Sequence, residues 1–348
     1  MQEINISVAM ATYNGEKYIA EQLESLSKQV LKPRELVICD DGSSDKTIKI
    51  IQEYASNSPF PVNLHQNSVN LGFADNFLQA ASLCQFEWIA FCDQDDVWMS
   101  DKISTINRVI LSSKRNDLLL ITHSAELTDA KLNLLNTKQP EHRKNKYVLR
   151  GKNFGFWVVP GFTCVFSKSL IVDFDWKHRP PCYDLNYPVL PHDKWICLLA
   201  NALGSTYYIS RSLAFYRRHQ STVTGDYKNF TLQGLISLSR QTGHENYKYL
   251  CDIALEISNF LTNIPCQVDQ KFLFNKNASY FYRLSNIYFL RSQMYSVNSR
   301  KKRLFYLFKL LFKKGYFGDA FLSLGLSSLF KDLFVCFFKI NTFEKDEI

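Results

Sequence analysis

Three aspartates stand within four positions at residues 93–96. The surrounding stretch reads FCDQDDVW and follows a run of apolar residues. Like charges this close repel one another and raise each other's pKa unless a cation or hydrogen-bond donors compensate them. Mg²⁺ or Mn²⁺ does so with oxygen ligands, often one or two carboxylates together with a substrate's phosphates. We therefore interpret Asp93, Asp95 and Asp96 as a metal and diphosphate site, the alternative being a capped turn.

Two further polar clusters also follow apolar, strand-like runs. TYNGE at 12–16 comes after INISVAMA, and DDGSSD at 40–45 comes after ELVIC. Strand-like runs and helical spacings alternate along the first hundred residues, with strands at 4–11, 35–39, 62–65 and 87–92 and helices at 16–29, 47–54 and 73–84. This alternation predicts an α/β fold with a parallel sheet flanked by helices. The three clusters should then meet at one edge of the sheet, facing a common crevice.

The remainder of the chain divides into two parts that differ in their pattern of apolar residues. Up to about residue 225 the patterns stay mixed, with a helix expected at 102–114, a strand at 118–122, a polar, loop-rich stretch at 129–150, a helix at 194–203, and short strands at 206–209 and 213–217. Beyond it, apolar residues recur at helical spacing and glycine becomes scarce. We therefore predict one α/β domain over residues 1–225 and a mainly helical region over residues 226–348.

Composition narrows the class of protein. The chain has 348 residues, of which 46% are hydrophobic and 21% charged, which is typical of a folded protein. No run of eighteen uncharged apolar residues occurs, and the first ten residues lack the features of a secretory signal. The nine cysteines are scattered, with no Cys-x-x-Cys pair, so we expect reduced thiols in a cytosolic protein and neither disulfides nor a zinc site.

Two common nucleotide-binding signatures are missing. The chain contains no Gly-x-x-x-x-Gly-Lys-Ser/Thr loop, which argues against a P-loop NTPase. The first strand is followed by Thr-Tyr-Asn-Gly-Glu and not by Gly-x-Gly-x-x-Gly, which argues against a dinucleotide dehydrogenase. What remains is a metal-dependent enzyme that acts on a nucleotide linked to another group.

An ordered set of four motifs points to a family. In sequence order they are VAMATYNGEKYIAEQLESLSKQ, ELVICDDGSSDKT, NLGFADNFLQAA and FCDQDDVW. The set resembles the family 2 glycosyltransferases, whose GT-A fold is a Rossmann-like, mostly parallel sheet flanked by helices. The resemblance covers about residues 4–225. It implies a catalytic domain that binds the nucleotide sugar with about residues 1–100 and the acceptor with about residues 101–225.

The resemblance implies roles for residues near the nucleoside. The residues that would border it are Thr12, Tyr13, Asn14 and Glu16. Asp40 and Asp41 would lie in the loop that recognises a pyrimidine base, where a carboxylate can accept the imide N–H. Asn76 would approach the sugar nucleotide.

The resemblance also divides the acidic cluster by role. Asp93 would hold the ribose or a metal-bound water, and Asp95 would bind the Mg²⁺ or Mn²⁺ that bridges the two phosphates. Asp96 would touch the donor sugar or the metal. The cation would neutralise the charge that grows on the nucleoside diphosphate as it leaves.

Two downstream residues complete the implied site. Family 2 enzymes invert the anomeric centre, and Asp193 in PHDKW resembles their base, unless it only caps a helix. A helix N-terminus would lower its pKa and keep it ionised. His219 in FYRRHQSTVTG could reach the metal or the diphosphate, the alternative being a structural histidine. Arg217 and Arg218 could neutralise phosphate there or form a solvated pair.

The choice of donor depends on finer likenesses. DQDDVW, HDKW and the Tyr-Arg-x-His pattern look like those of bacterial rhamnosyltransferases, which use dTDP-rhamnose to build cell-surface polysaccharides. The acceptor would be a hydroxyl of such a glycan or of a lipid-linked precursor. A UDP-hexose donor (galactose, glucose or GlcNAc) is the first alternative. A non-catalytic, nucleotide-sugar-binding assembly subunit is the second.

The helical region has its own charge pattern. Residues 300–314 read RKKRLFYLFKLLFKK, with seven basic residues and no acid, and an apolar stretch follows to residue 340. We interpret them as amphipathic helices on the anionic inner face of the cell membrane, which would make the protein cytoplasmic and peripheral. The alternatives are a buried helical subdomain with a basic rim and a homodimer interface. No nucleic-acid-binding motif accompanies the charge.

Overall fold

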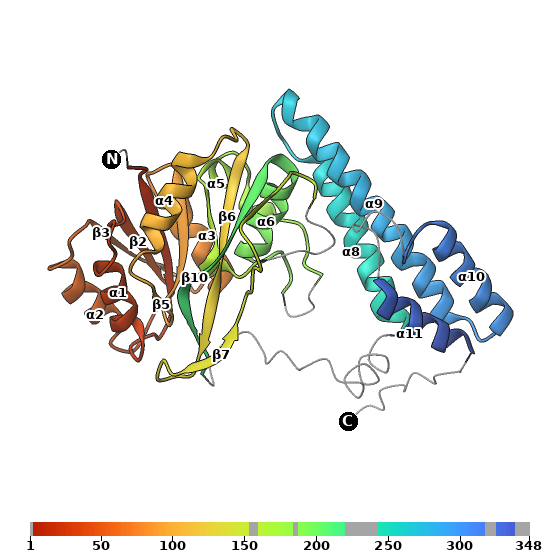
Figure 1. The fold of residues 1–348 in the computed structure, drawn as a ribbon, viewed down its shortest axis with the longest axis horizontal. Coiled ribbons are helices and arrows are strands. Elements are labelled where there is room, and N and C mark those ends of the chain that lie inside the picture. The colour runs from red at the N-terminus through yellow and green to blue at the C-terminus, as the bar shows by residue number, and fades with distance from the viewer. Residues whose placement is uncertain (1–2, 153–158, 184–186, 220–242, 317–324, 338–348) are drawn as a thin grey trace. The chain divides into compact units, whose positions relative to one another are not determined.

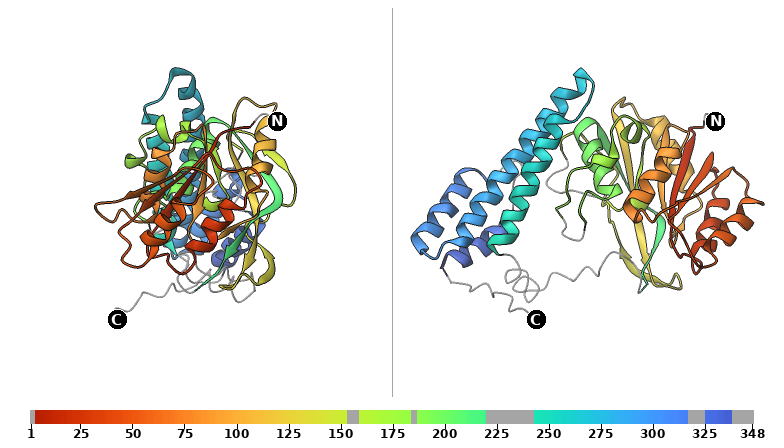
Figure 2. Two further views of the ribbon diagram at one scale, coloured as in Figure 1. Left: turned by 90° about the vertical axis from the view of Figure 1, so that its left-hand side faces the viewer. Right: turned by 180° about the vertical axis from the view of Figure 1, so that it is seen from behind.

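The computed structural model describes residues 3–152, 159–183, 187–219, 243–316 and 325–337. The chain folds as two compact units, which can be followed in Figures 1 and 2. The first comprises Met1–Gly151, Trp157–Arg179 and Leu190–Thr222, and the second comprises Lys152–Phe156, Pro180–Val189 and Val223–Ile348. The predicted boundary near residue 225 lies outside the described residues.

A ten-stranded sheet forms the centre of the first unit. Its strands are β1 (Ile6–Thr12), β2 (Glu35–Asp40), β3 (Val62–Gln66), β4 (Trp88–Asp93), β5 (Val97–Trp98), β6 (Leu118–Thr128), β7 (Leu134–Lys138), β8 (Lys146–Val148), β9 (Val165–Ser167) and β10 (Ser205–Arg217). Their order is β3-β2-β1-β4-β9-β6-β10-β5, with β7 beside β6 and β8 beside β10. The first four strands in this order pair in parallel, as do β6 and β10, whereas β9 is antiparallel to both its neighbours. The predicted mostly parallel sheet is confirmed.

Helices flank this sheet, as predicted. They are α1 (Ile19–Ser27), α2 (Thr47–Ala55), α3 (Phe73–Leu83), α4 (Lys102–Ser112), the short α5 (Ser169–Val172) and α6 (His192–Leu203), with 3₁₀ turns η1 (Gly161–Thr163) and η2 (Trp176–His178). In α1 the buried residues Ile19, Leu23 and Leu26 recur at spacings of four and three, so one stripe of the helix packs on the core. In the sheet, α3 contacts β1, β2 and β4, and α6 contacts β6 and β10.

The second half of the sheet differs from the prediction. The strand expected at 118–122 extends to Thr128, and the stretch at 129–150, expected to be loop-rich, contains β7 and β8. The two short strands expected at 206–209 and 213–217 form one strand, β10. The pairing of β10 with β6 shifts register between Ile209 and Ser212, so a bulge in a continuous strand looks like a turn in the sequence.

All nine cysteines are free thiols, as predicted. Cys39, Cys84, Cys92 and Cys164 are fully buried in the first unit. Burial raises the pKa of Cys39 to about 12 and also raises the pKa of the other three thiols. These thiols therefore act as small apolar core residues.

The second unit is helical, as predicted. Its described helices are α8 (His244–Asn263), α9 (Val268–Ser296), α10 (Arg300–Phe312) and α11 (Gly325–Phe337). The α8 and α9 helices pack along each other, and α10 contacts both α9 and α11 (Figure 1). In the described part of the chain, no helix is both long enough and apolar enough to cross a bilayer.

A buried ion pair joins α9 to α11. The guanidinium of Arg291 donates to both carboxylate oxygens of Asp332, at 2.8 and 2.9 Å, and both residues are buried. The hydroxyls of Tyr295 and Tyr316 donate to the same carboxylate. The charge of Asp332 is thus matched by one cation and four hydrogen bonds, which is what a buried carboxylate needs.

Candidate active site

The ends of three parallel strands bring the polar clusters together. Thr12 pairs with Asp40 between β1 and β2, and Ala11 pairs with Asp93 between β1 and β4. The segments that follow β1, β2 and β4 therefore leave the sheet at one edge, as parallel pairing requires. The candidate site is built on this edge.

Asp40 is a structural carboxylate. Its oxygens accept hydrogen bonds from the hydroxyl of Thr12, from both the hydroxyl and the backbone N–H of Ser43, and from the backbone N–H of Gly42. A carboxylate has about four acceptor positions, so these four bonds saturate it. Asp40 is also buried, and its side chain holds the loop after β2 in place.

Asp41 retains an acceptor position. Its oxygens accept from the backbone N–H groups of Leu71 and Gly72 and from the side chain of Asn67, at 2.7–3.0 Å. These three bonds tie the loop after β2 to the start of α3. One of the roughly four lone pairs is left for a ligand, so Asp41 is better suited than Asp40 to accept from a nucleobase.

Asn76 lies behind this loop. It is buried, and its Nδ2 donates to the backbone oxygens of Cys39 at 2.9 Å and Thr12 at 3.4 Å. Its Oδ1 accepts from Asn67. The polar atoms of Asn76 are thus committed to the ends of β1 and β2.

The loop after β1 is held from two sides. Asn14, in the left-handed conformation with φ 47°, donates from its backbone to Ser43 and accepts from the N–H of Ser44. Glu16 accepts from the N–H of Lys46. Tyr13 is 52% exposed, so its side chain is available to a ligand.

Gln94 forms the other support and was not singled out by the sequence analysis. Its amide accepts from the N–H of Tyr13 and donates to the carbonyl of Tyr13, each at 3.0 Å. The amide also lies over Gly15, where a Cβ would come within 2.2 Å of Oε1 of Gln94. A side chain at Gly15 would therefore displace the amide of Gln94 from its present position.

The three aspartates of that segment lie in different environments. Asp96 is fully buried, with Oδ1 accepting from the N–H of Arg217 at 3.0 Å and Oδ2 without a partner among the described residues. Burial, Asp95 and Asp93 hold the pKa of Asp96 well above its usual range. Asp93 is half-buried, and burial followed by the charges of Asp95 and Asp193 raises its pKa to about 8. The described side chains thus compensate the charge of three ionised carboxylates too weakly, and Asp93 and Asp96 favour their protonated forms at pH 7.

His219 joins the cluster. Its Nε2 lies 2.9 Å from Oδ2 of Asp95, and its ring packs 4.6 Å from the ring of Tyr18. The two residues are 124 positions apart, so the predicted proximity of His219 to the acidic segment depends on β10 returning beside it. No three His, Cys, Asp or Glu side chains of the described ranges converge as a complete metal site. A cation here would need ligands from its substrate.

Arg217 is not the solvated or phosphate-binding residue that was expected. It is buried, and its guanidinium donates to the backbone oxygens of Asp95 and Ala130 and to the carboxylate of Glu21. The guanidinium also lies 4.5 Å from the ring centroid of Tyr18. Arg217 therefore fixes the acidic segment against α1 and β10, with each of its three guanidinium nitrogens bonded to a protein oxygen.

Asp193 is the second residue of α6, whose N-cap is Pro191. Its Oδ1 accepts from the N–H of Lys194 at 2.7 Å. The pKa of Asp193 is nevertheless raised to about 6, because burial outweighs this hydrogen bond. The prediction that the helix N-terminus keeps this pKa low is therefore wrong in direction, although most of the carboxyl is ionised at pH 7.

His192 anchors the start of α6. Its buried ring stacks on Phe77 with centroids 4.2 Å apart and meets the edges of Phe73 and Phe91. Burial lowers its pKa to about 3, so the ring is neutral. Its place in the aromatic cluster positions Asp193 beside the end of β4.

A buried lysine, also missed by the sequence analysis, lies under the cluster. The ammonium of Lys102 donates to the backbone oxygen of Phe162 at 2.8 Å and lies 3.6 Å from the ring centroid of Trp98. Burial lowers the pKa of Lys102 to about 7, although neighbouring acidic groups, which include Asp96 and Asp93, act to raise it. Lys102 is therefore a local counter-charge. Nothing in SDKI distinguishes it from an exposed lysine at a helix start.

Comparisons with known proteins agree with this architecture. Residues 7–172 match the family described as Glycosyl transferase family 2. The dTDP-rhamnosyl transferase RfbG of Shigella flexneri is 28% identical over 221 residues, which are 62% of this chain and 73% of that protein. The abequosyltransferase RfbV of Salmonella typhimurium is 33% identical over 103 residues, 29% of this chain and 31% of that protein.

A solved structure supports the fold. TarS of S. aureus, residues 1–349, superimposes with a TM-score of 0.52 at 17% identity, covering 88% of this chain and 85% of that one. The same fragment has also been solved in complex with UDP-GlcNAc. At this identity the likeness concerns the fold alone.

Proposed function

We propose that this chain, which is a family 2 glycosyltransferase over residues 7–172, moves a sugar from a nucleoside diphosphate to an acceptor hydroxyl with inversion. The observation that supports this most is the electrostatic neighbourhood of Asp93. Its pKa is raised first by burial, then by the charge of Asp95 from its own loop and by that of Asp193 from the start of α6. A donor-binding segment and a candidate base thus meet at one edge of the sheet.

Asp193 serves as the general base in this proposal. A pKa of about 6 leaves the carboxylate ionised at neutral pH and still basic enough to take a proton from a hydroxyl as it attacks. Asp193 is half-buried at the start of α6. His192 holds the helix that carries it.

The donor is dTDP-rhamnose in this proposal. The support is the likeness to a dTDP-rhamnosyl transferase over 62% of the chain, together with the free acceptor position on Asp41 for an imide N–H of thymine. Tyr13 and the loop around Asn14 and Glu16 would border the nucleoside. Uracil offers the same N–H, so a UDP-hexose donor remains the alternative.

Mg²⁺ or Mn²⁺ would be held by Asp95 and His219, with Asp93 beside them. These groups fit a hard divalent cation, since Nε2 of His219 and Oδ2 of Asp95 lie 2.9 Å apart and the charge of Asp95 raises the pKa of the neighbouring Asp93. The cation would offset the negative charge on the leaving diphosphate. Asp96, fully buried, would act from behind by holding the backbone of Arg217.

The acceptor would be a cell-surface glycan or a lipid-linked precursor, and the protein would work at the inner face of the cell membrane. A lipid-linked acceptor stays in the bilayer, so the helical unit would have reason to contact lipid. Homodimerisation through that unit is the competing arrangement.

A donor screen with a base variant tests the proposal. Purified protein with Mn²⁺ should release the nucleoside diphosphate from dTDP-rhamnose, and a chelator should abolish release. Asp193→Asn should lower transfer by about 10²–10⁴-fold while the thermal shift caused by the donor persists. Release only from UDP-sugars would overturn the rhamnosyl assignment, and an active Asp193→Asn variant would overturn the base.

A further inference from the structure

The outer face of α10 carries an exposed aromatic stripe. Phe305, Phe308 and Phe312 follow at spacings of three and four and are 54%, 67% and 90% exposed. The opposite face, with Leu307 and Leu310, is buried against the rest of the unit. The three phenylalanines therefore do not pack in the core of the unit. In a buried helical subdomain, side chains of this size would be covered by protein.

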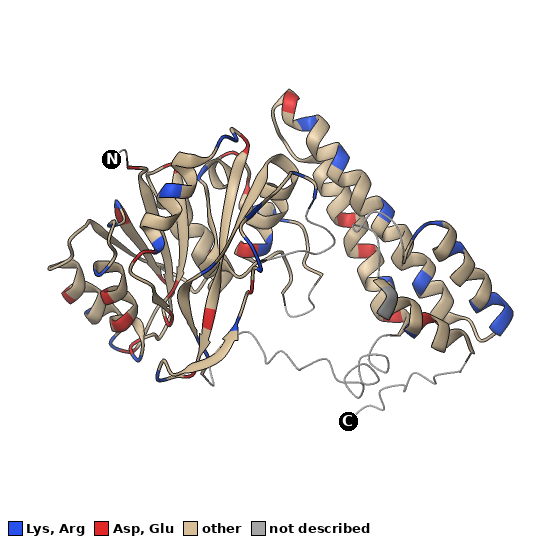
Figure 3. Ribbon diagram, in the orientation of Figure 1, with Lys and Arg blue, Asp and Glu red and all other residues tan. Residues whose placement is uncertain are grey.

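A second stripe of positive charge runs beside the first. Lys302, Lys309 and Lys313 are exposed and recur at spacings of seven and four. The ammonium of Lys309 lies 4.4 Å from the ring centroid of Phe305. Within the described residues none of these three lysines forms an ion pair. Figure 3 shows basic and no acidic residues along α10.

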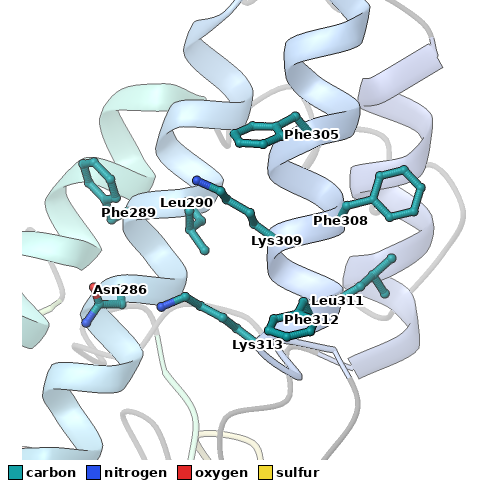
Figure 4. A pocket seen from close by; sticks show the side chains of 9 residues that line it. All are labelled: Asn286, Phe289, Leu290, Phe305, Phe308, Lys309, Leu311, Phe312 and Lys313. Carbon is teal, nitrogen blue, oxygen red and sulfur yellow. The ribbon is translucent and has the colours of Figure 1, made fainter.

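The two stripes border an open groove. It has a volume of about 760 Å³ and lies between α9 and α10 (Figure 4). Phe289 and Asn286 line it from α9, and Phe305, Lys309 and Lys313 line it from α10. An apolar floor with ammonium groups at its rim matches a ligand that has an apolar part and an anionic head.

Charge distinguishes between the possible occupants. Residues 300–314 contain seven basic residues and no acid. A second copy in a two-fold dimer would present the same surface, so its like charges would oppose pairing. An anionic bilayer complements the charge and also accepts phenylalanine side chains, which a nucleic-acid backbone does not.

We propose that this surface, formed by Phe305, Phe308 and Phe312 with Lys302, Lys309 and Lys313, binds anionic phospholipid at a bilayer surface. The rings enter the boundary between headgroups and acyl chains, and the lysines contact lipid phosphates. This deepens the proposed function, for which it supplies the membrane contact. It does not depend on the donor or on catalysis.

Vesicle sedimentation without any donor tests the proposal. The full chain should bind vesicles that contain phosphatidylglycerol and should not bind pure phosphatidylcholine. Binding should weaken at high salt, because each lysine acts through screened charge. Lys302→Gln/Lys309→Gln/Lys313→Gln should lower affinity by at least about tenfold, and Phe305→Ser/Phe308→Ser/Phe312→Ser by a similar factor.

Matched controls distinguish binding by this surface from non-specific binding of vesicles by exposed aromatic or basic residues. Phe272→Ser removes a phenylalanine of α9 that is 72% exposed and lies outside the groove, and Lys28→Gln with Lys49→Gln removes exposed charge from the first unit. Both controls should bind like wild type. Equal binding to neutral vesicles, tighter binding to a single-stranded oligonucleotide, or a dimer that the phenylalanine variant dissociates would each overturn the proposal.

Discussion

Nε2 of His219 and Oδ2 of Asp95 lie 2.9 Å apart, although 124 residues separate them in sequence. If both bind the cation, removing the imidazole leaves one fewer donor. We expect His219→Ala to raise the Mn²⁺ concentration needed for half-maximal donor cleavage by about 10–100-fold. Tyr18→Phe, which keeps the ring that packs on His219, is the control. An unchanged Mn²⁺ titration would show that His219 is structural.

The pH dependence of transfer should follow Asp193. Its carboxylate must be deprotonated to accept the proton, and its pKa is raised to about 6. The rate should therefore be high at pH 7–8 and fall about tenfold per unit once the pH drops below about 6. The measurement is kcat/KM from pH 4.5 to 8.5 at saturating Mn²⁺. A flat profile through pH 6 would exclude Asp193 as the titrating base.

Asp96→Asn should stabilise the fold at high pH. Burial holds the pKa of Asp96 well above its usual range, so the folded protein keeps a proton that the unfolded chain releases, and this costs stability as pH rises from about 4, the unfolded-state pKa, to the folded-state pKa. Asparagine still accepts from the N–H of Arg217 but carries no charge. We expect the Tm of the variant to exceed that of wild type at pH 8 by about 2–4 °C more than at pH 5.

The Tm comparison has a clear contrary outcome. If the metal-free Asp96→Asn variant were destabilised equally at both pH values, the raised pKa of Asp96 would not limit the stability of the fold, and the carboxyl would make a stabilising interaction that asparagine cannot replace. Asp117→Asn, on a carboxylate whose pKa is lowered by Arg115, should instead lose stability about equally at pH 5 and pH 8, because both values lie above the unfolded-state pKa of about 4.

Gly15→Ala should impair donor binding without unfolding the protein. The new Cβ would collide with the amide of Gln94, which would have to leave its two hydrogen bonds with Tyr13. We expect an increase in donor KM of about tenfold, because the loop after β1 would lose its support. Gln94→Ala should give a similar increase, and the double variant should be no worse than either single one. Additive losses would mean that the two residues act independently.

Asp332→Asn should destabilise the helical unit. It removes the charge that pairs with Arg291 and leaves a buried cation, which costs about 3–5 kcal/mol. Adding Arg291→Met should recover much of that loss, because no unpaired charge remains. Urea unfolding followed by far-UV circular dichroism provides the measurement. Equal stability of the single and double variants would contradict this account.

The strand ends were predictable because the pattern there is local. An apolar run followed by Asp40 or Asp93 places a carboxylate at the end of a parallel strand whatever the rest of the fold does. The shared edge then follows from parallel pairing. The resemblance added Asp193 and His219, which the spacing alone could not bring near the cluster.

The roles within the site were less predictable, because burial decides them. Lys102, Arg217 and Gln94 are ordinary polar residues in the sequence, and only the packed structure shows where their donors go. The direction of the Asp193 pKa shift was missed for the same reason. The start of a helix can be predicted from the sequence, whereas the desolvation that raises the pKa of Asp193 depends on all the residues packed around its carboxyl.

The distribution of buried and partly buried thiols allows local unfolding of the two units to be followed by alkylation of the native cysteines. Cys39 in β2, Cys92 in β4 and Cys84 at the end of α3 are buried and have raised pKa values. An alkylating reagent therefore cannot reach them in the folded protein, and little reactive thiolate is present there. Cys251 and Cys266 in the helical unit are only partly buried. Mass spectrometry of pulse-alkylated protein can therefore time the opening of the catalytic sheet separately from that of the helices, with no label added to the sequence.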